Sequence, residues 1–141
     1  MIEMNIRQLF FDRSAVKSKT DPATRRVLSK FGAFVRRGAR SSIRKRKRIS
    51  QPGMPPSSHT GLLRNFIWFG YEPQRNSVVI GPVRLNGNDG KAPSLLEYGG
   101  TTLRRKKGDV ESVTVRPRPY MGPAFDRELP KLPGMWRDSV R

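Results

Sequence analysis

The stretch from Asp21 to Ile43 reads DPATRRVLSKFGAFVRRGARSSI, and it decides the fold expected for this chain. Its apolar residues recur every three or four positions, a spacing that gathers them on one face of a long helix. Asp21 and Pro22 form the expected helix start, because Asp caps free backbone N–H groups and Pro suits the first helical position. Gly32 and Gly38 weaken such a helix by about 1 kcal/mol each relative to Ala, and they allow a neighbouring element to approach closely. The expected apolar face consists of Val27, Leu28, Phe31, Phe34, Val35, Ala39 and Ile43.

A basic, proline-rich segment is expected to end this helix. It reads IRKRKRISQPGMPP from Ile43 to Pro56, and its prolines exclude further helix. Basic side chains stabilise the negative end of a helix dipole. The unbroken basic run from Arg44 to Arg48 is larger than that task requires, so we expect it to have a partner.

The middle of the chain predicts a hairpin. Residues Leu62 to Tyr71 are apolar and aromatic, and Ser77 to Val83 contain a β-branched run. The polar residues between them, with Pro and Asn, favour a turn. The two runs therefore predict antiparallel strands.

The last third of the chain predicts one more strand and a shorter helix. Val113 and Val115 alternate with polar residues in a strand expected from Ser112 to Arg116. The basic residues that precede it are expected to form a hairpin tip or a mobile arm. Residues 124–129 are expected to be helical, with Pro130 and Pro133 breaking or kinking that helix.

These patterns together predict an α+β fold, in which a long N-terminal helix packs on a small antiparallel sheet and a shorter helix follows near the C-terminus. We expect the sheet to have about three to five strands. The length of 141 residues predicts a single domain, 1–141. Within it, residues 1–20 are expected to form an N-terminal arm and residues 101–111 a basic loop or arm.

The charge is the strongest compositional signal. The chain has 29 Lys and Arg against 11 Asp and Glu, a formal net charge of +18, and no acidic residue occurs from Pro22 to Tyr71. A field of this sign attracts polyanions and repels a second copy of the chain. The expected partners are therefore nucleic acid, an anionic surface or acidic faces of other proteins.

Other compositional features exclude whole classes of chemistry. The chain has no cysteine, which excludes disulfides, thiolate nucleophiles and zinc–thiolate sites. Its first residues lack the apolar core of a signal peptide, and no apolar run approaches the roughly 20 residues of a membrane helix. We therefore expect a protein made in the cytoplasm and used in a soluble setting.

The only histidine lies in the stretch SSHTGLLRNF, Ser57 to Phe66. General acid–base catalysis requires a partner within hydrogen-bond reach, and no acidic residue lies near His59 in the sequence. Ser57, Ser58 and Thr60 suit turns and caps. We therefore interpret this stretch as the joint between helix and sheet, not as an active site.

The acidic residues do not predict a catalytic pair. Asp109 and Glu111 would share one face of a strand, whereas Asp126 and Glu128 would not face each other on a helix. Solvation or pairing with arginines is the better interpretation of both pairs. Glu97, which precedes two glycines, is expected to cap or pair at a packed corner. No phosphate-binding glycine pattern occurs, so we predict no catalytic, cofactor or metal site and no enzymatic activity.

Several short sequence motifs, taken in order, resemble those of a known family. They are TGLLR at residues 60–64, VIGP at 79–82, EYGGT at 97–101 and the step from Arg118 to Ala124, all following a basic helix. In this order they resemble the tail-completion, or minor tail component, proteins of tailed bacteriophages, including the lambda Z-like group. The match extends from about Pro22 to Leu129, most of the chain.

The resemblance implies a structural virion protein of the phage neck. It implies a homo-oligomeric, hexameric ring that helps to join tail to head around the DNA path, beside other neck and tail proteins. Genomic DNA would pass through the lumen without being read for sequence. The chain would be made in the host cytoplasm and end in the virion, with no membrane and no cofactor as partner.

Two sets of residues are the candidate contacts within this interpretation. Phe10, Phe11, Trp68 and Trp136 are expected at contacts between subunits, with core packing as the alternative for each and at least as good an interpretation for Trp68. The expected contacts with DNA or an acidic partner are Arg36, Arg37, Arg40, Arg44, Lys45, Arg46, Lys47, Arg48, Arg104, Arg105, Lys106 and Lys107.

Two other functions fit parts of the sequence. A ribosomal or other RNA- or DNA-binding protein without sequence specificity would have similar charge and similar Gly/Pro loops, with Phe66 and Trp68 available to stack on bases. A phage-encoded nuclease or other enzyme is the other alternative, and metal-dependent cleavage that is lost when Asp109 or Glu111 is changed would support it.

Overall fold

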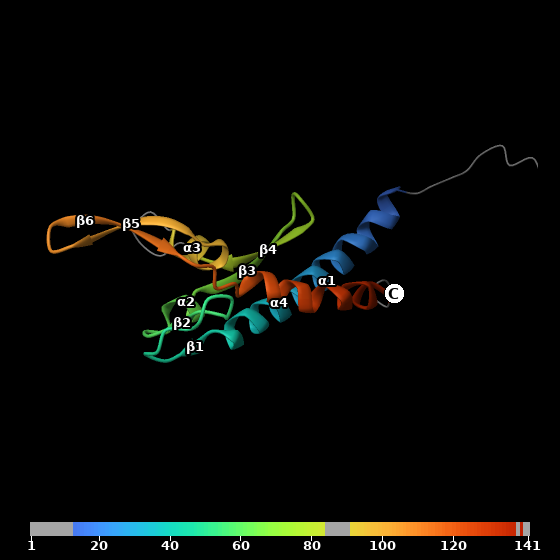
Figure 1. Ribbon diagram of the computed structural model, residues 1–141. Coiled ribbons are helices and arrows are strands. Elements are labelled where there is room, and N and C mark those ends of the chain that lie inside the picture. Colours follow the sequence, from blue (N-terminus) through green and yellow to red (C-terminus); the bar gives the residue numbers. More distant parts are fainter. Residues whose placement is uncertain (1–12, 84–90, 138, 140–141) are drawn as a thin grey trace, which may run out of the picture.

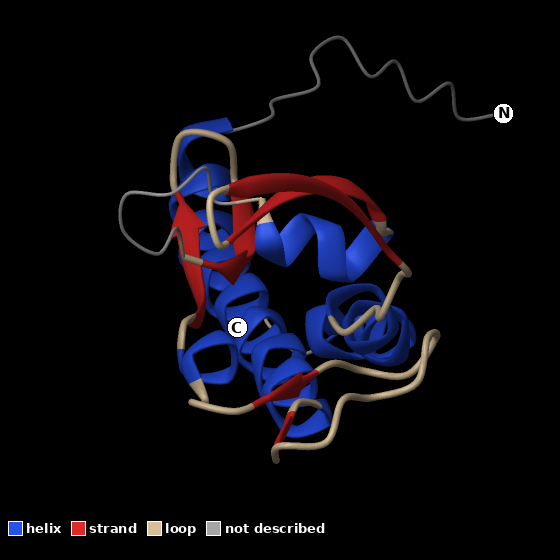
Figure 2. Cartoon of the chain, turned by 60° about the vertical axis from the view of Figure 1, so that its left-hand side comes forward, coloured by secondary structure: helices blue, strands red, loops and turns tan. Residues whose placement is uncertain are grey.

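The computed structural model describes residues 13–83, 91–137 and 139. They form an α+β fold in which one long helix contacts the hairpin of residues 67–82 and the helices of residues 121–137 (Figure 1). Figure 2 shows the helices at the centre and the strands around them. The predicted fold class is confirmed.

The long helix, α1, extends over Arg13–Ser42, so the predicted start at Asp21 is wrong. Pro22 lies inside the helix. A proline removes one backbone hydrogen bond from a helix, but this loss does not force the helix to end when the residues on both sides keep helical backbone. The predicted end is confirmed, since the basic segment follows directly.

The core lies along one face of α1. Of the seven residues expected on that face, Leu28 and Phe34 are only half-buried, and the others are buried. Phe31 also meets Phe125 edge to face, with ring centroids 5.6 Å apart. The core cluster consists of Phe31, Val35, Ala39, Ile43, Ile67, Tyr120 and Ala124.

The predicted hairpin is confirmed as β3, Ile67–Glu72, paired antiparallel with β4, Ser77–Pro82. Because side chains alternate between the two faces of a strand, one face of the hairpin packs on α1. Ile67 belongs to the core, and Val78 and Ile80 pack against it. Residues 62–65, which we expected to be strand, instead form a short helix, α2, Leu62–Asn65. Gly61 enters it with φ 81°, a left-handed conformation that glycine adopts readily.

Two glycines of α1 lie where other elements approach the helix. A Cβ atom at Gly32 would lie 2.8 Å from Val78 Cγ2 and 2.9 Å from Phe69 Cδ2. A Cβ atom at Gly38 would lie 3.5 Å from the Cβ of Ala124. The predicted close approach at these glycines is therefore confirmed, with β3–β4 at Gly32 and a C-terminal helix at Gly38.

The prediction of a single sheet of three to five strands is wrong for the described residues. Their strands form three separate two-stranded sheets. One is a short parallel pair, β1, Arg44–Lys45, and β2, Ser57–Ser58. The third is an antiparallel hairpin of β5, Gly100–Lys106, and β6, Asp109–Val115, here called the arm. Figure 1 shows the arm extending away from the rest of the molecule.

Glycine explains why the arm leaves the body of the protein. Gly99 and Gly100 have φ 75° and 140°, backbone conformations that residues other than glycine rarely adopt. They turn the chain from α3, Ala92–Tyr98, into β5, so the new strands pair with each other instead of extending the β3–β4 sheet. The sequence did not predict α3, because its short apolar patch has no clear helical period.

The C-terminal region contains α4, Met121–Glu128, the 3-10 turn η1, Leu129–Lys131, and α5, Leu132–Arg137. The predicted interruption at Pro130 and Pro133 is confirmed, since these prolines lie in η1 and in the first turn of α5. The Nζ atom of Lys131 lies 2.9 Å from both oxygens of the Glu128 carboxylate, which is mostly buried.

Candidate nucleic-acid interface

The basic segment Arg44–Arg48 is exposed on an anchored support. Ile43, directly before it, is fully buried, and β1 pairs with β2. The Arg46 backbone N–H donates to the Ser58 carbonyl at 3.2 Å, and Arg46 Nε donates to Ser57 Oγ at 2.9 Å. All five basic side chains of the segment are exposed. The charges therefore face solvent while the backbone beneath the first of them is fixed.

The loop that follows is held by the chain near residue 118. Arg118 Nε donates to the Ser50 carbonyl at 3.1 Å, and the Gly53 N–H donates to the Pro117 carbonyl at 2.9 Å. Ile49 and Met54 are nevertheless 75% and 58% exposed. Apolar side chains beside a basic run suit a surface that is covered in an assembly.

The arginines of α1 differ in what they can contact. Arg36 is half-buried: its Nε donates to the Ile67 carbonyl at 2.6 Å, and its guanidinium lies 5.1 Å from the Trp68 ring centroid. Arg36 therefore joins α1 to β3, a role that the sequence did not reveal. Arg37 is exposed beside the Phe34 ring, at 5.8 Å, and Arg40 is half-buried.

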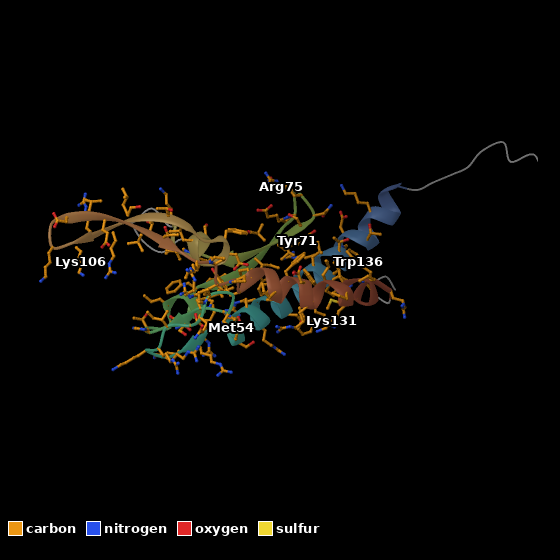
Figure 3. The ribbon with its side chains drawn as sticks, viewed as in Figure 1. Met54, Tyr71, Arg75, Lys106, Lys131 and Trp136 are labelled. Carbon is orange, nitrogen blue, oxygen red and sulfur yellow. The ribbon has the colours of Figure 1, made fainter. Side chains whose placement is uncertain are left out.

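The arm presents the second basic group. Lys107, with φ 50°, and Gly108, with φ 96°, form its tip. Arg104 pairs in register with Glu111, and Lys106 pairs with Asp109, so opposite charges share one face of the arm. Figure 3 shows Lys106 at the outer end of the arm. All four basic residues, Arg104–Lys107, are exposed.

Glu97 fixes the base of the arm. The prediction that Glu97 caps or pairs at a packed corner is confirmed. Its carboxylate accepts hydrogen bonds from the backbone N–H groups of Tyr120, Met121 and Gly122 at 2.8, 3.0 and 2.7 Å. These are free N–H groups at the start of α4, where a negative charge is favourable. The Arg118 N–H also donates to the Leu96 carbonyl at 2.6 Å. The end of α3 is thereby joined to the start of α4.

Burial raises the pKa of the Tyr120 hydroxyl to about 12, with further contributions from the negative charge of Glu97 and from Tyr98. The Tyr120 side chain is almost fully buried in the core cluster. The hydroxyl therefore stays protonated at neutral pH and belongs to the support of the arm rather than to an exposed surface.

The candidate subunit contacts differ in their surroundings. Phe10 and Phe11 lie outside the described residues. Trp136 is 37% exposed on α5, where it is labelled in Figure 3, and Trp68 is 53% exposed on β3. Core packing is therefore not the main role of Trp68, which lies on the side of the hairpin that faces away from α1.

The residues considered for chemistry are not brought together. His59 is exposed in the joint before α2, and Asp109 and Glu111 lie exposed on the arm. Residues 13–83, 91–137 and 139 contain no group of three or more His, Asp or Glu side chains that could hold a metal ion.

The basic groups lie at one end of the molecule. In Figure 1, β1 and the outer part of the arm both lie toward the left, away from the start of α1 and from the C-terminal helices.

None of the helices in the described part of the chain is long and apolar enough to cross a membrane. No family model, curated protein or solved structure matches this chain.

Proposed function

We propose that this chain is a structural subunit of the neck of a tailed bacteriophage, where copies of it form a ring that helps to join tail to head. The proposal is supported by the ordered set of sequence motifs that resembles tail-completion proteins, and by surfaces that suit an assembled subunit. The hexameric ring size rests on the resemblance alone. In this role the chain is not an enzyme and needs no cofactor.

The observation that carries the proposal is the exposure of Arg44–Arg48 on an anchored loop. Five consecutive basic side chains in solvent attract phosphates through charge, and they do not require a particular base sequence. A ring lumen that meets passing DNA needs this property. The exposed Ile49 and Met54 beside the run would be covered by neighbouring neck or tail proteins.

Salt dependence of DNA binding tests the basic segment. We expect the affinity of the purified chain for duplex DNA to fall linearly on logarithmic axes, with a slope of about −0.9 per phosphate contacted. Replacing Arg44–Arg48 by glutamine should make the slope clearly shallower. Arg25→Gln with Arg26→Gln, two exposed positions on α1, is the control and should change the slope less. An unchanged slope in the five-residue variant would contradict the assignment.

A non-specific RNA-binding protein is the second candidate, favoured by one observation. Trp68 is 53% exposed on a sheet face, as are the aromatic residues on which RNA-binding sheets stack bases. The Arg36 guanidinium beside its ring reduces the face available for stacking. Retention of the chain on ribosomes through a moderate salt wash, with loss of retention in Trp68→Ala, would favour this candidate over the neck.

A further inference from the structure

We propose that the arm of one copy docks on the β3–β4 hairpin of the next copy, so that each subunit is both donor and receiver. This inference rests on the proposed ring and names the contact that builds it. It follows from two exposed faces of the same chain that match each other in apolar character and in charge.

The donor is the arm face, made by alternate residues of the two strands. Leu103 lies opposite Ser112, and Arg105 lies opposite Val110. Leu103 is 71% exposed and Val110 is 58% exposed. The arm face consists of Thr101, Leu103, Arg105, Val110, Ser112 and Thr114, all of them exposed.

The other side of the arm has a different character. Near the base, Thr102, Val113 and Val115 are half-buried. Near the tip, Arg104 lies opposite Glu111 and Lys106 lies opposite Asp109, so the charges largely balance. The arm face therefore carries the exposed apolar side chains. It also carries Arg105, a basic side chain that has no acidic residue opposite it in the register.

The receiver is the outer face of the β3–β4 hairpin, the side turned away from α1. Trp68 lies opposite Gly81, and Val79 lies opposite Gly70, so large and small residues alternate diagonally. Trp68 and Val79 are 53% and 56% exposed, and the space where a Cβ would stand at either glycine is open. The outer face therefore offers two recesses beside two apolar side chains, which suits insertion of Leu103 and Val110.

The distribution of charge favours the outer face as the docking surface for the arm, because most of the chain is strongly basic. A second copy repels the arm over most of its surface, because each chain has a net charge of +18. The outer face carries Glu72, on the same side of β3 as Trp68 and Gly70. Among the described residues, the Glu72 carboxylate accepts one hydrogen bond, a long one from Ser77 Oγ at 3.4 Å. Its carboxylate can therefore receive Arg105 of the arm face, as complementary interfaces require.

The two faces are different surfaces, so the contact is head to tail. Such a contact leaves a free arm and a free outer face on every added copy, and it produces a ring when the rotation closes. Figure 1 shows the arm extending away from the body, which directs its outer part toward a neighbour.

Cysteine cross-linking tests the contact, since the chain has no native cysteine. Full-length chains carrying Val79→Cys are mixed with chains carrying Leu103→Cys that differ in tag length, and the mixture is mildly oxidised. Glu111→Cys is the matched control, because Glu111 is also exposed but lies on the other face of the arm. We expect the Val79–Leu103 disulfide to form at least about tenfold faster than the Val79–Glu111 disulfide, a difference of about 1.4 kcal/mol. Equal rates overturn the proposal.

Charge reversal gives a second readout by light scattering. Arg105→Glu and Glu72→Arg should each weaken self-association by about tenfold, and the double variant should restore it. A double variant no better than the single variants would contradict the pairing. Copies that assemble without the specific cross-link would overturn the arm contact and leave the ring intact. A specific cross-link in a chain whose loss leaves phage particles normal would retain the contact and contradict the neck function.

Discussion

Glu97 is the residue on which the position of the arm depends. It lies in the last turn of α3, and its carboxylate accepts hydrogen bonds from backbone N–H groups at the start of α4. The sequence indicated a corner residue because an acidic side chain preceded two glycines. It could not identify the partners, because residues 120–122 follow Glu97 by more than 20 positions and are separated from it by the whole arm.

Removing this carboxylate should destabilise the fold. In Glu97→Ala we expect the free energy of unfolding to fall by about 2 kcal/mol, because three backbone N–H groups lose a charged acceptor. Glu111→Ala, an exposed position on the arm, should change the free energy by less than about 0.5 kcal/mol. Denaturant unfolding of the two variants measures both. Equal effects would contradict the role of Glu97.

Tyr120 should make stability depend on pH in the alkaline range. Its pKa is about 12 in the folded chain and 10.0 without the fold, so the folded state holds this proton more tightly. Between these values the unfolded state binds fewer protons, and stability falls as pH rises, by about 1.4 kcal/mol per pH unit. The contribution is fully present below pH 10. Tyr120→Phe should remove this part of the slope in unfolding measured across that range, and an identical slope would contradict the assignment.

Among the elements, those with a clear period were predictable and those that depend on distant packing were not. The apolar spacing predicted α1 and its core face, and β-branched runs predicted β3–β4. The basic run also predicted a hairpin tip where the arm turns, whereas α2, α3 and the separation of the arm from β3–β4 depended on glycines with positive φ and on contacts with residues far along the chain. The exposed basic groups followed from composition, whereas the bond from Arg36 to Ile67 required the docked hairpin.

The contact between α1 and β3–β4 depends on the missing side chain at Gly32. In Gly32→Ala the new methyl would overlap Val78 and Phe69, which costs about 1–3 kcal/mol. This cost exceeds the gain in helix propensity of about 1 kcal/mol, so we expect net destabilisation. Gly134→Ala in α5 meets no atom within 4 Å and should stabilise by up to about 1 kcal/mol. Thermal unfolding compares them, and a stabilised Gly32→Ala would contradict the close packing.

At the scale of the whole molecule, the proposed role as an assembly subunit rests on exposed charge and exposed apolar side chains. Its described residues expose basic runs in the segment after α1 and at the tip of the arm, extend that arm from the body and expose apolar side chains on both hairpins. A chain with a net charge of +18 needs anionic partners, and the exposed apolar faces need neighbours. A neck ring around DNA supplies both.

Electron microscopy of lysates tests the neck function most directly. The gene is disrupted in the phage that encodes the chain, and particles are compared with those from the same phage complemented with the intact gene. We predict full heads beside unattached or malformed tails, with joined particles restored by complementation. Normal, infectious particles in the absence of the protein would contradict the account.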